Sequence, residues 1–173
     1  DMHWVAQPKY AIDPLSFIQK LKLKYFGFPH PKDIGPLISK VSAEIKQATL
    51  NQFKLNDKPF FLFNAGSGAH KKSGELAADI FYLAAQRFQA IHKITCVMVF
   101  GINYPKPLPK DNNVIVVPSL ANEQFIALIE AASGRVFSAG DTILQAIELK
   151  KTCVAVAVAD DQSKRLSACV NQN

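Results

Sequence analysis

The sequence predicts an α/β fold, in which a doubly wound, mostly parallel sheet follows a helical N-terminal arm. Short uncharged runs rich in Val, Ile and Phe recur after residue 58, as expected for strands covered on both faces. Segments with apolar residues at three- and four-residue spacing lie between these runs and predict amphipathic helices. Because strands and helices alternate, we expect parallel strands joined by right-handed crossovers.

The first third of the chain has a less regular pattern. Residues 15–23 are expected to form a helical turn or two, and residues 23–29 a short strand that ends at a proline. Residues 34–53 carry apolar side chains at helical spacing and predict an amphipathic helix. We therefore divide the chain into an arm, residues 1–57, and a sheet domain, residues 58–173.

The sheet domain accounts for most of the regular pattern. Its strands are predicted at residues 59–63, 94–101, 114–117, 135–138 and 152–159. Its helices are predicted at residues 73–91, 121–132 and 142–150, with a last helix after Asp161. The last strand alternates β-branched and small residues without a charge, so we expect both of its faces to be covered.

Composition limits the classes of function. The 173 residues are 49% hydrophobic and 20% charged, enough for a buried core. No apolar run approaches the roughly 20 residues that cross a bilayer. The net charge of +6 favours anionic partners, and a peripheral contact with a membrane surface stays open. The lysines between residues 9 and 58 are scattered and form no groove-reading motif, which argues against a nucleic-acid partner.

The cysteines indicate the redox compartment of the protein, and the first residue indicates whether the chain is part of a longer protein. Cys96, Cys153 and Cys169 show neither CxxC nor Cys–His spacing, so we expect no metal site and no disulfide framework. We expect these cysteines to be small residues of the core, with their thiols reduced. A reducing compartment implies a cytoplasmic location. Because the chain begins with Asp rather than Met, we expect it to be part of a longer protein.

Three motifs follow strands of the predicted sheet. AGSGA at residues 65–69 follows the first strand, and SAGDT at residues 138–142 opens a helix. DDQ at residues 160–162 stands beyond the last strand. Glycines allow close approach of a ligand, a helix N-terminus favours anions, and open α/β sheets bind ligands at the carboxyl ends of their strands. We therefore expect a phosphate-bearing ligand between these motifs.

In this order the motifs resemble the C-terminal, nucleotide-sugar-binding domain of glycosyltransferases that have two Rossmann-like domains, the GT-B architecture. UDP-sugar transferases and the MurG-like enzymes that use UDP-N-acetylglucosamine are the most similar. The resemblance covers residues 58–172 and is most specific across 135–162. Residues 25–29 also look like the V-G-x-P crossover that joins the two domains in that family.

The resemblance implies a set of donor-binding residues. The first glycine loop would lie under the diphosphate, and the second would receive the phosphates on backbone N–H groups and a hydroxyl. Further residues would bind the ribose, the donor sugar and, largely through backbone, the base. The first loop is Gly66, Ser67 and Gly68, and the second is Gly140, Asp141 and Thr142. Gln145 would bind the ribose, and Asp161 and Gln162 would bind the donor sugar. Pro118, Ser119 and Leu120 would bind the base.

The sequence departs from the family pattern at three positions. Gln145 stands where the family has a Glu, and an amide bonds a ribose less strongly than a carboxylate does. Ser138-Ala139 replaces a His that often precedes the second turn. Asp141 brings a negative charge close to the expected diphosphate, which is repulsive unless Lys71, Lys72 or a metal compensates, or unless Asp141 caps the helix.

The resemblance implies the donor-binding half of a glycosyltransferase, with a nucleoside-diphosphate sugar, expected to be a UDP-sugar, as its ligand. The acceptor and its activating base are expected on a missing N-terminal domain, so no catalytic residue is assigned in this chain, and no cofactor. One alternative is a sugar-nucleotide epimerase or hydrolase of the same architecture, for which His70 is the candidate acid or base. Another is a non-catalytic α/β binding module.

Overall fold

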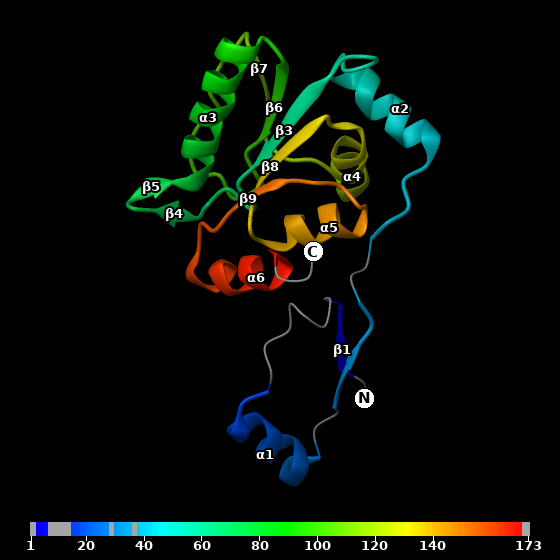
Figure 1. Cartoon of the computed structure of the whole chain (residues 1–173), viewed down its shortest axis with the longest axis vertical. Helices are drawn as coiled ribbons and strands as arrows, with labels where there is room; N and C mark the ends of the chain where they lie inside the picture. The colour runs from blue at the N-terminus through cyan, green and yellow to red at the C-terminus, as the bar shows by residue number, and fades with distance from the viewer. Residues whose placement is uncertain (1–2, 7–14, 28–29, 36–37, 171–173) are drawn as a thin grey trace.

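The structure is a computed structural model that describes residues 3–6, 15–27, 30–35 and 38–170 (Figure 1). Its centre is a five-stranded sheet in which all neighbouring strands are parallel. The strands are β3 (Phe60–Asn64), β6 (Thr95–Val99), β7 (Val114–Val117), β8 (Gly134–Ser138) and β9 (Val154–Val156). The helices of this part are α3 (Ala77–His92), α4 (Asn122–Ala131), α5 (Asp141–Glu148) and α6 (Asp160–Val170). The predicted α/β class with a parallel sheet is confirmed.

The strands follow the order β7-β6-β3-β8-β9. The path through this sheet therefore begins at its central strand β3 and moves outward through β6 to β7. The chain then returns to the other side of β3 and adds β8 and β9. The strand order reverses at β3, whose Phe63 pairs with Met98 of β6 and with Val136 of β8. In open α/β sheets, ligands bind at the carboxyl ends of the strands beside such a reversal.

Helices cover both faces of the sheet (Figure 1). On one face, Leu62 and Val97 pack in a cluster with apolar residues of α4 and α5. On the other face, Phe63 and Met98 pack with apolar residues of α3. Successive strand residues point to opposite faces, so the uncharged runs are buried on both sides, as the sequence predicted.

Strand β9 differs from its prediction. It spans only Val154–Val156, and it is the last strand of the sheet, paired with β8 alone. The side chains of Val154 and Val156 are 62% and 37% exposed. The prediction that both faces of this strand are covered is therefore wrong, because an apolar alternation does not reveal whether a strand lies at the edge of a sheet.

The first third of the chain contains β1 (His3–Val5), α1 (Phe17–Phe26), β2 (Pro31–Asp33) and α2 (Ala43–Gln52). Helix α1 begins at Ser16, whose side chain forms a reciprocal capping box with Gln19, and ends at Gly27 in the left-handed conformation. The strand predicted at 23–29 is therefore wrong for residues 23–26, and residues 28–29 lie outside the described residues. The parallel pair of β1 and β2 was not predicted.

Helix α2 is shorter than predicted and packs on the sheet domain. It begins after Ser42, whose hydroxyl accepts the N–H of Ile45, rather than near residue 34. Lys46 forms a 3.1 Å ion pair with Glu130 of α4, and Leu55 is only 2% exposed in the sheet core. The boundary at residue 57 stays a prediction. Among the described residues, no helix is both long and apolar enough to cross a membrane.

Asp111 anchors the long loop between β6 and β7. Its Oδ2 accepts hydrogen bonds from the Tyr82 hydroxyl at 2.6 Å and from Gln86 at 2.9 Å, both on α3. Its Oδ1 accepts the N–H groups of Asn113 and Val114. Burial by itself would raise the pKa of Asp111, but these hydrogen bonds outweigh it and lower the pKa from 3.8 to about 2.

This carboxylate should make stability depend on pH in the acid range. Since the folded pKa lies below the unfolded one, its contribution is complete above pH 3.8 and is lost as pH falls towards 2. We expect Asp111→Asn to lower the free energy of unfolding at neutral pH by about 1 kcal/mol and to flatten this acid slope. Urea titrations across the range measure both. Asp57→Asn, at an exposed position, is the control, and an equal acid slope in wild type and Asp111→Asn would contradict the prediction.

Candidate functional site

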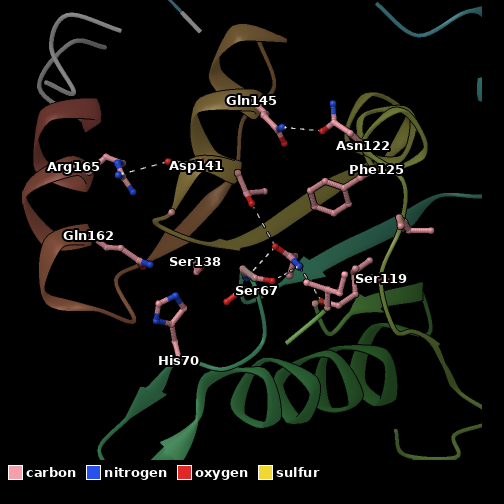
Figure 2. Close-up of a pocket in the computed structure, with 18 of the residues that line it drawn as sticks. Ser67, His70, Ser119, Asn122, Phe125, Ser138, Asp141, Gln145, Gln162 and Arg165 are labelled. Carbon is pink, nitrogen blue, oxygen red and sulfur yellow. Dashed lines mark hydrogen bonds and ion pairs between the residues drawn. The ribbon is translucent and has the colours of Figure 1, made fainter. Parts of the chain in front are cut away.

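A cleft of about 610 Å³ opens at the carboxyl ends of the sheet strands, beside the reversal at β3 (Figure 2). Residues that follow β3, β6, β7 and β8 form its walls, together with the first turns of α5 and α6. All but two of the residues predicted to bind the nucleotide-sugar donor line this cleft. They are Gly66, Ser67, Ser119, Leu120, Gly140, Asp141, Thr142, Gln145, Asp161 and Gln162.

Pro118 and Gly68 are the predicted residues that do not line the cleft. The carbonyl oxygen of Pro118 accepts the N–H of Gly101 at 2.8 Å. Gly68 has a packing role. Its φ is +95°, and a Cβ atom there would lie 2.4 Å from the carbonyl oxygen of Phe100 and 3.0 Å from Tyr104. Gly68 therefore allows the loop after β3 to pack against the loop after β6. Gly101, with φ +98°, makes the reciprocal contact with Gly66 and Ser67.

Asn64, the last residue of β3, holds three elements at the cleft together. Its side chain is 4% exposed, and its amide donates to the carbonyl oxygens of Val99 at 3.0 Å and Gly66 at 3.3 Å. Its oxygen accepts the N–H of Gly66 at 3.0 Å and the Thr142 hydroxyl at 3.4 Å. The loop after β3, the end of β6 and the start of α5 are thus fixed relative to one another. Sequence reasoning missed this residue, although its place between a buried strand and a glycine turn was a signal.

The N-terminus of α5 has no side-chain cap. Gly140 is the cap residue, and the structure gives no side chain that accepts an N–H group of the first turn. The first N–H groups of a helix lack intrahelical partners, and the helix dipole places partial positive charge there. The Thr142 hydroxyl, which lines the cleft, donates to Asn64. This helix end is therefore suited to receive an anion.

Ser138 lies at the base of the cleft, directly before the turn that opens α5. Its side chain is fully buried, and its Oγ has no hydrogen-bond partner among the described residues. A Cβ atom at Gly66 would lie 3.1 Å from this Oγ, and one at Gly140 would lie 3.8 Å from it. A buried hydroxyl without a partner costs about 1–3 kcal/mol, which a ligand oxygen in the cleft would recover.

Sequence reasoning noted Ser138 only because Ser138-Ala139 replaces a His that members of the suspected family often have. A stronger signal was present, because a polar residue directly follows the apolar Val136 and Phe137 at the end of the strand. At the carboxyl end of a parallel strand such a residue faces the ligand-binding edge.

Arg165 of α6 compensates the charge of Asp141. Its guanidinium lies 3.6 Å from an Asp141 carboxylate oxygen, and it donates to the carbonyl of Ala139 at 3.3 Å. Figure 2 shows Asp141 directed towards α6. The Asp141 side chain is 80% exposed and caps no N–H group of α5. The compensating charge thus comes from Arg165, which sequence reasoning missed. Arg165 follows Asp161 by one helical turn, so the sequence already placed both residues on the same side of the last helix.

Lys71 and Lys72, one of the ways considered to offset the charge of Asp141, lie outside the cleft. They form the short strand β4 (Lys71–Lys72), which pairs with β5 (Glu75–Leu76) in a hairpin that the sequence did not predict. Neither lines the cleft, and Lys72 donates to the carbonyl of Ala157 at 2.5 Å.

Gln162 and Asp161 belong to the first turn of α6 rather than to a strand tip. The Gln162 side chain is 4% exposed, and its oxygen accepts the N–H of Val158 at 3.0 Å. A Cβ atom at Gly140 would lie 3.7 Å from its amide nitrogen. Gln162 therefore presents a hydrogen-bond donor, its side-chain amide, to the cleft from a fixed position.

The opposite wall comes from α4 and from the loop after β7. Gln145 donates to the side-chain oxygen of Asn122 at 3.3 Å, so that two neutral amides lie side by side (Figure 2). The Phe125 ring lines the same wall and packs against Phe137, with ring centroids 6.2 Å apart. Ser119 and Leu120 follow β7 on this side. Neither Asn122 nor Phe125 was predicted.

The polar groups of the cleft include one imidazole and several hydrogen-bond donors. His70 lines the cleft and is exposed. Within the part of the chain that the structure describes, no group of three or more His, Cys, Asp or Glu could hold a metal ion. What converges is a set of hydrogen-bond donors: the N–H groups of α5, the Ser138 hydroxyl and the Gln162 amide.

The chain matches no protein-family model, no curated protein and no solved structure. The glycosyltransferase resemblance therefore stays a prediction. What the structure establishes is a five-stranded parallel α/β sheet with a polar cleft at the carboxyl ends of its strands.

Proposed function

We propose that the cleft binds a nucleoside-diphosphate sugar, most simply a UDP-sugar, and that the chain is the donor-binding half of a GT-B glycosyltransferase. The observation that carries this proposal is the pairing of an uncapped helix N-terminus at Gly140 with the buried, unpartnered hydroxyl of Ser138. Both are hydrogen-bond donors, and both face the same cleft beside the reversal of strand order. An anionic group with several acceptor oxygens, such as a diphosphate, satisfies them together.

The surroundings support the same ligand. The carboxylate of Asp141, which would repel a phosphate, is paired with Arg165. The amides of Gln145 and Asn122 are suited to ribose hydroxyls, and Ser119, Leu120 and Phe125 to a planar base. Asp161 and Gln162 would bind hydroxyls of the donor sugar on the other side of the phosphates.

The proposed chemistry is electrostatic. As the glycosidic bond breaks, negative charge builds on the departing diphosphate, where the α5 N–H groups, its dipole and the Ser138 hydroxyl would stabilise it. The acceptor and its base would come from the other half of the enzyme. This chain by itself should therefore bind the donor while turning it over poorly.

Isothermal titration calorimetry with UDP, UMP, uridine and UDP-sugars tests the proposal. We expect UDP to bind at least tenfold more tightly than uridine, because the diphosphate occupies the α5 end. Ser138→Ala removes a donor without adding volume and should weaken UDP binding about tenfold, while uridine binding changes little. Ser133→Ala, at the opposite end of β8 and exposed, is the matched control. Equal binding of UDP and uridine, or no loss in Ser138→Ala, would refute the proposal.

A further inference from the structure

Helix α1 presents an apolar face to solvent. Phe17, Ile18, Leu21 and Tyr25 are 78%, 65%, 44% and 68% exposed, and no residue of α1 is buried. The spacing of these four residues puts them on one side of the helix, here named the α1 face. Leu23, which is half-buried, lies on the opposite side. Phe26, which is 73% exposed, also lies off this face, beside Leu23. Four of the six large apolar side chains of α1 therefore share one side and are directed outward.

Positive charge borders the α1 face on both sides. At 100° per residue, Lys20 and Lys24 lie along one border of the face and Lys22 along the other. Helix α1 contains no acidic residue. The Lys24 ammonium lies 5.6 Å from the centroid of the Tyr25 ring, so charge and aromatic surface are adjacent.

We propose that α1 lies in the surface of an anionic membrane, with the α1 face at the boundary between headgroups and acyl chains. A helix with an apolar, aromatic-bearing face bordered by lysines matches this environment, since aromatic rings favour the interfacial depth and lysines favour anionic headgroups. A second copy of the chain fits less well, because it would bring the same lysines together. Helix α1 contributes no residue to the nucleotide cleft, so this inference is independent of the proposed donor binding.

Vesicle co-sedimentation with the full chain tests the charge requirement. We expect binding to vesicles of phosphatidylcholine with phosphatidylglycerol and little binding to phosphatidylcholine alone. Replacing Lys20, Lys22 and Lys24 together by Gln should lower the partition constant about 100-fold, roughly fivefold for each lysine. The matched control replaces three exposed lysines of the sheet domain, Lys58, Lys110 and Lys164, by Gln and should cost less than threefold. Equal losses in the two variants, or no binding by wild type, would overturn the proposal.

Fluorescence tests which side of α1 enters the lipid. Trp4 is the single tryptophan of the chain, so a Trp4→Phe background leaves the emission to an introduced probe. Phe17→Trp, on the α1 face, should shift to shorter wavelength and be quenched by brominated acyl chains in anionic vesicles. Leu23→Trp, on the opposite side, should not. Equal quenching at both positions would overturn the proposal. So would a dimer in solution that Phe17→Ser dissociates, because a second copy would then cover the face.

Discussion

Replacing Arg135 by methionine should lower the free energy of unfolding by about 3–5 kcal/mol. Arg135 is 6% exposed, and its guanidinium donates to carbonyl oxygens at the end of α4: Ile129 at 2.5 Å, Ala132 at 2.5 Å and Glu130 at 3.5 Å. It also donates to the carbonyl of Thr152, before β9, at 3.4 Å. Methionine fills a similar volume but leaves these buried carbonyls without donors. Urea denaturation measures the loss.

Two further variants separate hydrogen bonding from charge. Burial lowers the pKa of Arg135, but a guanidinium stays charged at neutral pH, and here the negative end of the α4 dipole faces it. Arg135→Lys keeps the charge and cannot reach all of these carbonyls, so an intermediate loss is expected. Arg87→Met, on the exposed side of α3, is the control and should change stability by less than about 0.5 kcal/mol. A loss of the same size in Arg87→Met and Arg135→Met would contradict this explanation.

Replacing Gly101 by alanine should lower the free energy of unfolding by about 3–4 kcal/mol and abolish the proposed nucleotide binding. The φ of Gly101 is +98°, and a Cβ atom would lie 2.4 Å from the backbone oxygen of Gly66 and from the carbonyl carbon of Ser67. Backbone atoms cannot rotate away as a side-chain tip can, so the loop after β3 has to shift. That loop forms a wall of the cleft, and calorimetry with UDP would report its displacement.

Gly74 supplies the control for Gly101. Its φ is +87°, but a Cβ atom there has no neighbour within 4 Å. Gly74→Ala therefore introduces backbone strain without a steric clash. It should lower the free energy of unfolding by about 1 kcal/mol and leave the proposed UDP binding unchanged. If Gly74→Ala and Gly101→Ala were equally destabilising, close approach of the two loops would not be the reason that position 101 is a glycine.

The strands of the sheet could be predicted from the sequence because strands buried on both faces are uninterrupted runs of apolar residues. Residues 114–117 are all Val or Ile, and β7 spans Val114–Val117 as predicted. The glycine turns after β3 and β8 were equally visible and do lie at one cleft. Strand β9 was predicted, but its position at the edge of the sheet was not, since its valines look the same whether covered or exposed.

The partners of charged residues were much less accessible to sequence reasoning. In the sequence, Arg135 is a charged residue at the start of an apolar strand. The neighbouring residues do not indicate that the C-terminal end of α4 lies beside it. Arg165 compensates Asp141 only because α6 turns back across the start of α5. Such pairs depend on the relative placement of elements, which composition and periodicity do not specify. The small hairpin of β4 and β5 was missed because each strand has only two residues.

The bonds of Asn64 bear on how a ligand would enter. One amide side chain joins the loop after β3, the end of β6 and Thr142 at the start of α5, so none of these parts moves alone. A molecule arriving at the cleft would meet surfaces that are already in place, and little conformational entropy would be lost in ordering them. Association at such a preorganised surface should be fast, with differences between ligands expressed mainly in how long each one stays.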